Sequence, residues 1–152
     1  MTPRCELAGE WHPREVTVTK LPTGIVGNTG LYYACYRLSA LGWNVMPTAR
    51  NTRGIDVVCF SVDGKTVRTI QVKSLTKADT VPLGTDIEKI MGDFWIIVNS
   101  LGTDHPRAYV LLPHEVRALA IRNLGGKRAY WLPLKQYAVD AFEEQWQRIG
   151  QP

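Results

Sequence analysis

The stretch IDVVCFSVDGKTVRTIQVKS, residues 55–74, decides the fold of this chain. Two runs rich in β-branched residues flank Asp63-Gly64, and Asp-Gly between such runs is a strong signal for a β-hairpin. A two-residue turn at this dipeptide makes the numbers of paired residues sum to 127, which puts Asp56 directly opposite Gln71. Cross-strand neighbours have Cβ atoms roughly 4.5–5.5 Å apart. Because side chains alternate along a strand, Lys73 shares the face of Gln71.

A carboxylate, an amide oxygen and an ammonium at one end of a hairpin can support metal-assisted phosphodiester hydrolysis. Hard cations such as Mg²⁺ take oxygen ligands, usually one or two carboxylates together with waters and substrate phosphate. The metal lowers the pKa of bound water and offsets developing charge. A lysine beside it can orient or deprotonate that water, or stabilise the charge. The alternative is a simple ion pair between Asp56 and Lys73, worth roughly 0–1 kcal/mol if exposed.

The charge of the chain is concentrated around this hairpin. The sequence has a formal net charge of +4, and residues 50–77 account for all of it, with six basic residues against Asp56 and Asp63. A local basic cluster predicts phosphate binding, although a solvated basic hairpin has the same composition. The predicted nucleic-acid-binding residues in this segment are Arg50, Arg53, Lys65, Arg68 and Lys77.

Composition predicts one globular domain over residues 1–152. Apolar residues make up 45% and charged residues 21% of the chain, which is ordinary for a soluble protein. Three cysteines without a CxxC pattern argue against a disulfide framework or a zinc knuckle and favour a reducing cytoplasm. The N-terminus lacks a signal-peptide pattern, and the longest apolar runs are too short to span a bilayer. We therefore expect a cytoplasmic protein with no membrane partner.

The order of predicted elements indicates an α/β fold. We expect helices over about 29–41, 113–122 and 134–149, and strands at 43–48, 94–100 and 107–112 beside the hairpin. Asn28 or Thr29 is the expected cap of the first helix, and Gly42 its end. Residues 75–92 look irregular, with one helical turn near 86–91. This order predicts a central mixed β-sheet flanked by helices, with a core over about 24–115 and a helical C-terminal part over about 113–149.

With GID ending at Asp56 and QVK spanning Gln71 to Lys73, the sequence resembles the PD-(D/E)XK nuclease superfamily, which has the restriction-endonuclease-like fold. The surrounding LGWNV, RNTRGIDVV and DFWIIV resemble small bacterial members related to Holliday junction resolvases, and the resemblance covers roughly residues 24–115. It implies the order α-β-β-β-(α)-β-β-α and a DNA endonuclease that depends on Mg²⁺ or Mn²⁺. It also implies that Asp56 is a metal ligand, that Gln71 replaces the usual acidic ligand, that the Val72 carbonyl faces the metal, and that Lys73 is catalytic.

The sequence departs from that family at Leu31, where many relatives carry a glutamate in the first helix. Asp56 is then the only carboxylate of the predicted site, and a site of charge −1 holds Mg²⁺ more weakly than one of −2. Three alternatives remain open: another carboxylate joins the site, substrate phosphates complete the metal shell, or the site is inactive. The candidates for that other carboxylate are Glu10, Glu15 and Asp86.

Three functions follow from these observations. The first is a metal-dependent endonuclease that acts on DNA, and by analogy we expect a homodimer, because two strands require two sites. The second is a catalytically inactive domain of the same fold that binds nucleic acid or a protein. The third is an interaction module with no role in nucleic-acid binding.

Overall fold

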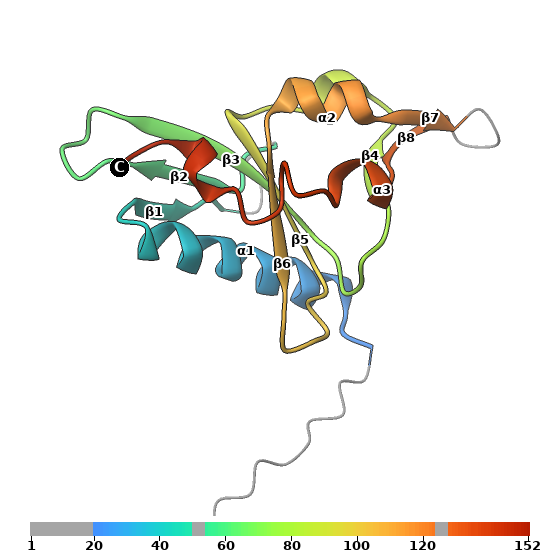
Figure 1. Cartoon of the computed structure of the whole chain (residues 1–152), viewed down its shortest axis with the longest axis horizontal. Helices are drawn as coiled ribbons and strands as arrows, with labels where there is room; N and C mark the ends of the chain where they lie inside the picture. The colour runs from blue at the N-terminus through green and yellow to red at the C-terminus, as the bar shows by residue number, and fades with distance from the viewer. Residues whose placement is uncertain (1–19, 50–53, 124–127) are drawn as a thin grey trace, which may run out of the picture.

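The computed structural model describes residues 20–49, 54–123 and 128–152, and Figure 1 shows how their elements are arranged. The centre is a five-stranded sheet in the order β1-β2-β3-β5-β6. β3 and β5 run parallel, whereas the other neighbours are antiparallel. The predicted central mixed sheet is therefore confirmed. Its strands are β1 (Asn44–Pro47), β2 (Val57–Phe60), β3 (Val67–Ser74), β5 (Phe94–Asn99) and β6 (Arg107–Leu111).

The hairpin of β2 and β3 has the predicted register but not the predicted turn. Its pairs run from Val57 with Ile70 to Phe60 with Val67, so paired numbers sum to 127. The connection is longer than two residues, because the Ser61 N–H donates to the Thr66 carbonyl at 2.9 Å and leaves four residues in the loop. Adding one residue on each side of Asp63-Gly64 keeps the sum unchanged, so the register survives the error.

Helix α1 (Thr23–Ala40) covers one face of this sheet (Figure 1). It begins well before the predicted residue 29, because Pro22 is the N-cap and its carbonyl accepts the N–H groups of Ile25 and Val26. Val26 is buried and extends the apolar stripe by one further turn. The helix ends at Ala40 with Leu41 as its C-cap, and Gly42, the residue predicted to end it, follows with a φ of +98° that suits glycine.

Strand β5 separates two hydrophobic cores. Ile96 and Val98 point toward α1 and join the first core, whereas Trp95 and Ile97 point to the opposite face and join the second. This explains why the strand reads as a continuous apolar run rather than an alternating one. All six of its residues are buried.

The second core lies under a smaller layer that the sequence did not predict as a sheet. Its three strands have the order β4-β8-β7, and α2 (Pro113–Leu119) lies beside them. Residues 75–92, predicted as irregular, contain β4 and the 3₁₀ turn η1 (Ile87–Lys89), which matches the helical turn expected near 86–91. The new strands are β4 (Val81–Gly84), β7 (Ile121–Asn123) and β8 (Ala129–Leu132).

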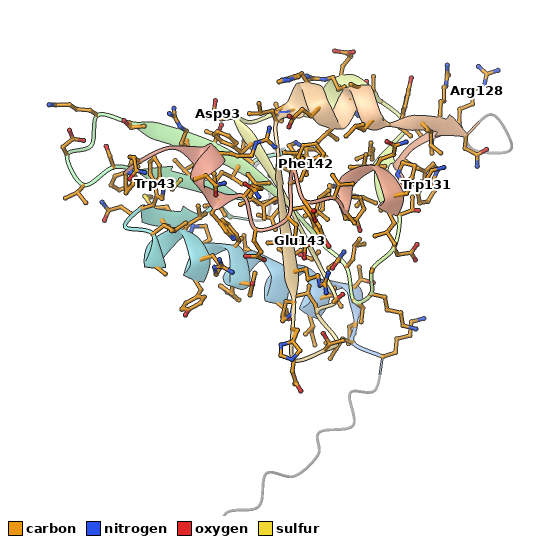
Figure 2. All side chains as sticks on the ribbon, in the orientation of Figure 1. Trp43, Asp93, Arg128, Trp131, Phe142 and Glu143 are labelled. Carbon is orange, nitrogen blue, oxygen red and sulfur yellow. The ribbon has the colours of Figure 1, made fainter. Side chains whose placement is uncertain are left out.

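The predicted helix over 134–149 is wrong. Only one turn forms, α3 (Leu134–Tyr137), and a second short turn, η2 (Trp146–Ile149), follows an extended segment. That segment runs beside β6: the Val110 N–H donates to the Phe142 carbonyl at 2.9 Å, and the Glu144 N–H donates to the Ala108 carbonyl at 2.8 Å. Figure 2 labels Phe142 and Glu143 over the middle of the sheet. The unpaired backbone of an edge strand thus outweighs the helical pattern.

The described ranges contain no helix that is both long and apolar enough to cross a bilayer.

Candidate active site

Asp56 is held in place between β1 and β3. Its carbonyl accepts the Thr48 N–H at 2.9 Å, and its own N–H donates to the Ile70 carbonyl at 2.9 Å. The Thr48 hydroxyl donates to the Ile55 carbonyl at 2.6 Å and closes the loop from the other side. These bonds fix the backbone that carries the carboxylate.

The carboxylate of Asp56 does not lie simply across from Gln71, as the hairpin register predicted. The ladder of β2 and β3 ends at Val57 and Ile70. Beyond it, Asp56 Oδ2 accepts the backbone N–H of Val72 at 2.7 Å. The side chain thus takes over the role of a ladder partner, because β2 supplies no further backbone acceptor for Val72.

The C-terminal half of β3 has one open edge. It pairs with β5 from Ile70 to Ser74, whereas β2 reaches only Ile70. The N–H and C=O of one strand residue point to the same side, so the Val72 carbonyl faces this open edge, as its N–H does. An oxygen acceptor and the Asp56 carboxylate therefore lie at the same edge.

Gln71 and Lys73 share the face of β3 that looks toward the second core. Lys73 Nζ lies 5.4 Å from the centre of the Trp95 ring. Burial lowers the pKa of Lys73, and the negative charge of Asp56 partly opposes that shift. The Gln71 Oε1 atom is buried and accepts no hydrogen bond from the described residues. A buried acceptor without a partner is costly, which makes this oxygen a candidate ligand atom.

A cleft of about 270 Å³ opens beside Asp56 and Lys73. Gln71 is not part of its lining. The ten lining residues come from α1, from the end of β1, from the turn before β2 and from β3; they are Thr23, Gly27, Asn28, Leu31, Thr48, Ala49, Asp56, Val72, Lys73 and Ser74. Of the predicted site, the structure thus brings Asp56, Val72 and Lys73 together in one cleft.

Helix α1 forms one wall of this cleft through a close approach at Gly30. A Cβ at Gly30 would lie 2.7 Å from the Ser74 Cβ, which no real side chain tolerates. The Ser74 hydroxyl donates to the Gly27 carbonyl at 3.2 Å and ties β3 to the helix. Leu31 is half-buried, packs on the first core and also lines the cleft. The Leu31 side chain therefore makes this part of the cleft wall apolar.

Sequence reasoning missed the residues that shape the cleft. Thr48 follows β1, Ser74 is the last residue of β3, and neither belongs to a recognisable motif. In the sequence, Gly27 and Asn28 indicated only the start of a helix. Their roles depend on α1 starting at Thr23, which places residues 23–31 beside β3. The available signal was Pro22, because a proline at the start of an apolar segment often marks the beginning of a helix.

Asp86 does not supply the missing carboxylate. Its Oδ1 accepts the Glu88 N–H at 3.0 Å and begins the η1 turn, away from the cleft lining. Glu10 and Glu15, the other two candidates, lie outside the described residues. Within the described ranges, no group of three His, Cys, Asp or Glu side chains could hold a metal ion.

The predicted basic cluster is divided by the fold. Arg50 and Arg53 lie outside the described residues. Lys65 lies 3.6 Å from Asp63 in the hairpin loop, and Arg68 Nε donates to the Ile149 carbonyl at 3.3 Å. Lys65 and Arg68 lie at the N-terminal end of β3, whereas the cleft lies at its C-terminal end, near Ser74. Lys77 follows that C-terminal end in the chain and, together with Lys20, lines a second hollow of about 730 Å³. Of the described basic residues predicted to bind DNA, Lys77 is the one next to the cleft in sequence.

The oxygen atoms around the cleft fit a hard divalent cation better than a soft one. They include the carboxylate of Asp56 and the carbonyl of Val72, and the lining contains no sulfur or imidazole; the buried amide oxygen of Gln71 belongs to the next residue of β3 but lies outside the lining. Mg²⁺ is often bound by one carboxylate together with water and substrate phosphate. The residues present therefore suit Mg²⁺ or Mn²⁺ only with substrate oxygens completing the shell.

Comparisons with known proteins bear on the fold. No protein-family model matches the sequence, and the curated proteins contain no significant match. Among solved structures, the bacterial homing endonuclease I-Ssp6803I is similar, with a TM-score of 0.55 and 15% sequence identity over 85% of this chain and 93% of that chain. The fold is a nuclease-like α/β fold. At this identity the likeness concerns the fold alone.

Proposed function

We propose that this protein is a metal-dependent endonuclease of the PD-(D/E)XK type that hydrolyses phosphodiester bonds in DNA. One observation carries the proposal: the Asp56 carboxylate, held by the Val72 N–H at 2.7 Å, shares a cleft with Lys73 at the open edge of β3. The fold that the chain shares with a homing endonuclease supports the same reaction class. Asp56, Gln71 and Val72 are the proposed metal ligands, and Lys73 is the proposed catalytic lysine.

In this proposal the chain positions its groups before substrate arrives. A divalent cation, when bound, supplies a Lewis acid for water activation and charge neutralisation. The Val72 N–H and the bonds of the Asp56 backbone hold the carboxylate in one orientation. Burial lowers the pKa of Lys73, which raises the neutral fraction able to accept a proton from the attacking water. The Trp95 ring, whose centre lies 5.4 Å from Lys73 Nζ, forms one side of the environment of this ammonium.

The test is cleavage of supercoiled plasmid with Mg²⁺ or Mn²⁺ present. Asp56→Asn keeps an oxygen that can accept the Val72 N–H but removes the charge, so the fold should persist while cleavage falls at least about 10²-fold. Asp63→Asn is the matched control, because it makes the same change at the opposite end of the hairpin, on a carboxylate that binds Ser61 and not Val72. The proposal fails if wild type and Asp56→Asn cleave equally.

A second candidate is an inactive domain of the same fold that binds nucleic acid or a protein. Leu31 in the cleft wall and the neutral Gln71 favour it, because they leave a charge of −1 at the site. Gln71→Glu separates the two candidates. If the site is active, the added carboxylate should lower the Mg²⁺ concentration needed for half-maximal cleavage; an inactive domain should show no cleavage at any metal concentration while still binding its partner.

We also propose a homodimer for double-strand cleavage, since each chain carries one such cleft. Light scattering on the purified protein measures the mass directly. A monomer that nicks only one strand would contradict this part of the proposal.

A further inference from the structure

A second basic region lies far along the sequence from the candidate cleft. Residues 116–139 contain five basic side chains and no acidic one, between Glu115 and Asp140. The net charge of the residues outside 50–77 is zero only because acidic residues elsewhere in the chain balance the positive charge of residues 116–139. Lys127 lies outside the described residues; the other four are Arg117, Arg122, Arg128 and Lys135. Such a concentration of positive charge attracts polyanions.

At the centre of this region, β7 (Ile121–Asn123) and β8 (Ala129–Leu132) pair as a two-stranded ribbon. β7 and β8 project from the body of the molecule (Figure 1), and Figure 2 labels Arg128 near the projecting end. All three residues of β7, Ile121–Asn123, are exposed. β7 is the last strand of its sheet, and no described strand pairs with its outer side. The ribbon therefore exposes both a backbone edge and basic side chains.

The root of the ribbon is anchored in the second core, so its outer part is held away from the body. Leu132 of β8 pairs with Val81 of β4, and both are fully buried. Further out, Arg122 pairs with Tyr130, and its guanidinium carbon lies 5.7 Å from the Tyr130 ring centre. This cation–π contact limits the freedom of the arginine at an exposed site.

We propose that the ribbon of β7 and β8 binds duplex DNA by lying in the major groove, with Arg122 and Arg128 contacting phosphates or base edges. The major groove of B-DNA admits a two-stranded β-ribbon, and arginine is the residue that most often contacts both phosphate and guanine there. The inference rests on the proposed function for the choice of DNA as the partner. It goes beyond that function by naming a recognition element separate from the cleft and the groove of the duplex that this element enters.

The experiment measures DNA binding without cleavage. The double variant Arg122→Gln/Arg128→Gln is made in the Asp56→Asn background, and its Kd is measured without metal by fluorescence anisotropy for a duplex and for the same strand unpaired. Loss of two phosphate contacts should weaken duplex binding about tenfold or more and reduce the slope of log K against log salt by about 1.8. Binding of the unpaired strand should change much less.

Lys89→Gln/Arg107→Gln is the matched control, because it removes the same charge at exposed positions outside the ribbon. Urea unfolding midpoints of both double variants should lie close to that of the parent, because all four side chains are exposed. The contacts that are lost, Arg107 with Glu143 and Arg122 with the Tyr130 ring, are each worth no more than about 1 kcal/mol at exposed sites. The proposal is overturned if the ribbon variant binds duplex DNA as the control does, or if the unpaired strand loses as much affinity as the duplex. The latter result would indicate general attraction of polyanions, acidic protein surfaces included.

The outcome for the ribbon is separable from the outcome for the cleft. Weaker duplex binding by the ribbon variant, with plasmid left uncut by every form of the protein, would support the ribbon and refute the nuclease. Cleavage that depends on Asp56, with duplex affinity unchanged by the ribbon variant, would refute the ribbon and support the nuclease.

Discussion

The contact between α1 and β3 at Gly30 gives the sharpest prediction about the structure that holds the cleft. A Cβ added at Gly30 would lie 2.1 Å from Ser74 Oγ, 2.7 Å from Ser74 Cβ and 3.3 Å from Leu101 Cδ1. Rotation of the hydroxyl removes the first overlap, but the second involves an atom that the backbone of β3 fixes. Gly30→Ala therefore forces the helix and the strand apart.

Two opposing effects set the size of the change. Overpacking a close-packed interface costs about 1–3 kcal/mol, and it separates the walls of the cleft. Alanine in place of glycine inside a helix contributes about 1 kcal/mol in favour of folding. The expected result is a net loss of up to about 2 kcal/mol in the free energy of unfolding. Gly27→Ala, in the same helix with nothing within 4 Å of the added Cβ, should show only the favourable effect.

Urea unfolding measures both variants, with the midpoint reporting stability and the slope reporting any change in exposed surface. A double-mutant cycle with Ser74→Gly isolates the overlap. Gly30→Ala should cost about 1–2 kcal/mol less in the Ser74→Gly protein, because the opposing Cβ is gone. Equal stability of Gly30→Ala and Gly27→Ala would falsify the close approach, and so would an absence of coupling to Ser74.

Two further predictions concern the supports of the fold. Burial by itself would raise the pKa of Glu115, but its hydrogen bonds, including one from Arg148 at 2.6 Å, have the larger effect and lower the pKa. The carboxylate therefore contributes its full stability above the unfolded pKa of about 4.3. That stability is lost as pH falls through the lower pKa of the folded state. Glu115→Gln should reduce the free energy of unfolding by about 1–2 kcal/mol at neutral pH and by much less in acid, as urea unfolding at several pH values would show; a pH-independent loss would contradict the pairing. Tyr137→Phe removes the donor to the Asp79 carbonyl at 2.6 Å and the acceptor of the Asn99 amide at 3.3 Å, and should cost about 1–3 kcal/mol in the same assay because Asn99 stays buried; an unchanged midpoint would refute that bond network.

The elements that sequence reasoning predicted well are those set by neighbours in the chain. Alternation and the Asp63-Gly64 turn residues determine the hairpin, so Gln71 and Lys73 share a face whatever surrounds them. The buried strands at β5 and β6 follow from their apolar runs. The predicted helix over 134–149 does not form, because backbone groups of that segment hydrogen-bond to the carbonyl of Ala108 and the N–H of Val110 on β6 instead of to one another. The helical pattern alone carries no information about that edge.

The candidate site shows the same division. The sequence by itself determined which residues lie near the open end of the hairpin, because turn chemistry and a two-residue period act over a few positions. Only the tertiary structure decided that the Asp56 carboxylate binds the Val72 N–H, and that Gly30 brings α1 against Ser74 to form a cleft. Those contacts join segments that are distant in the chain, and their geometry depends on how the helix packs on the sheet. Local pattern cannot encode that packing, since it depends on the length of α1 and on where β2 ends.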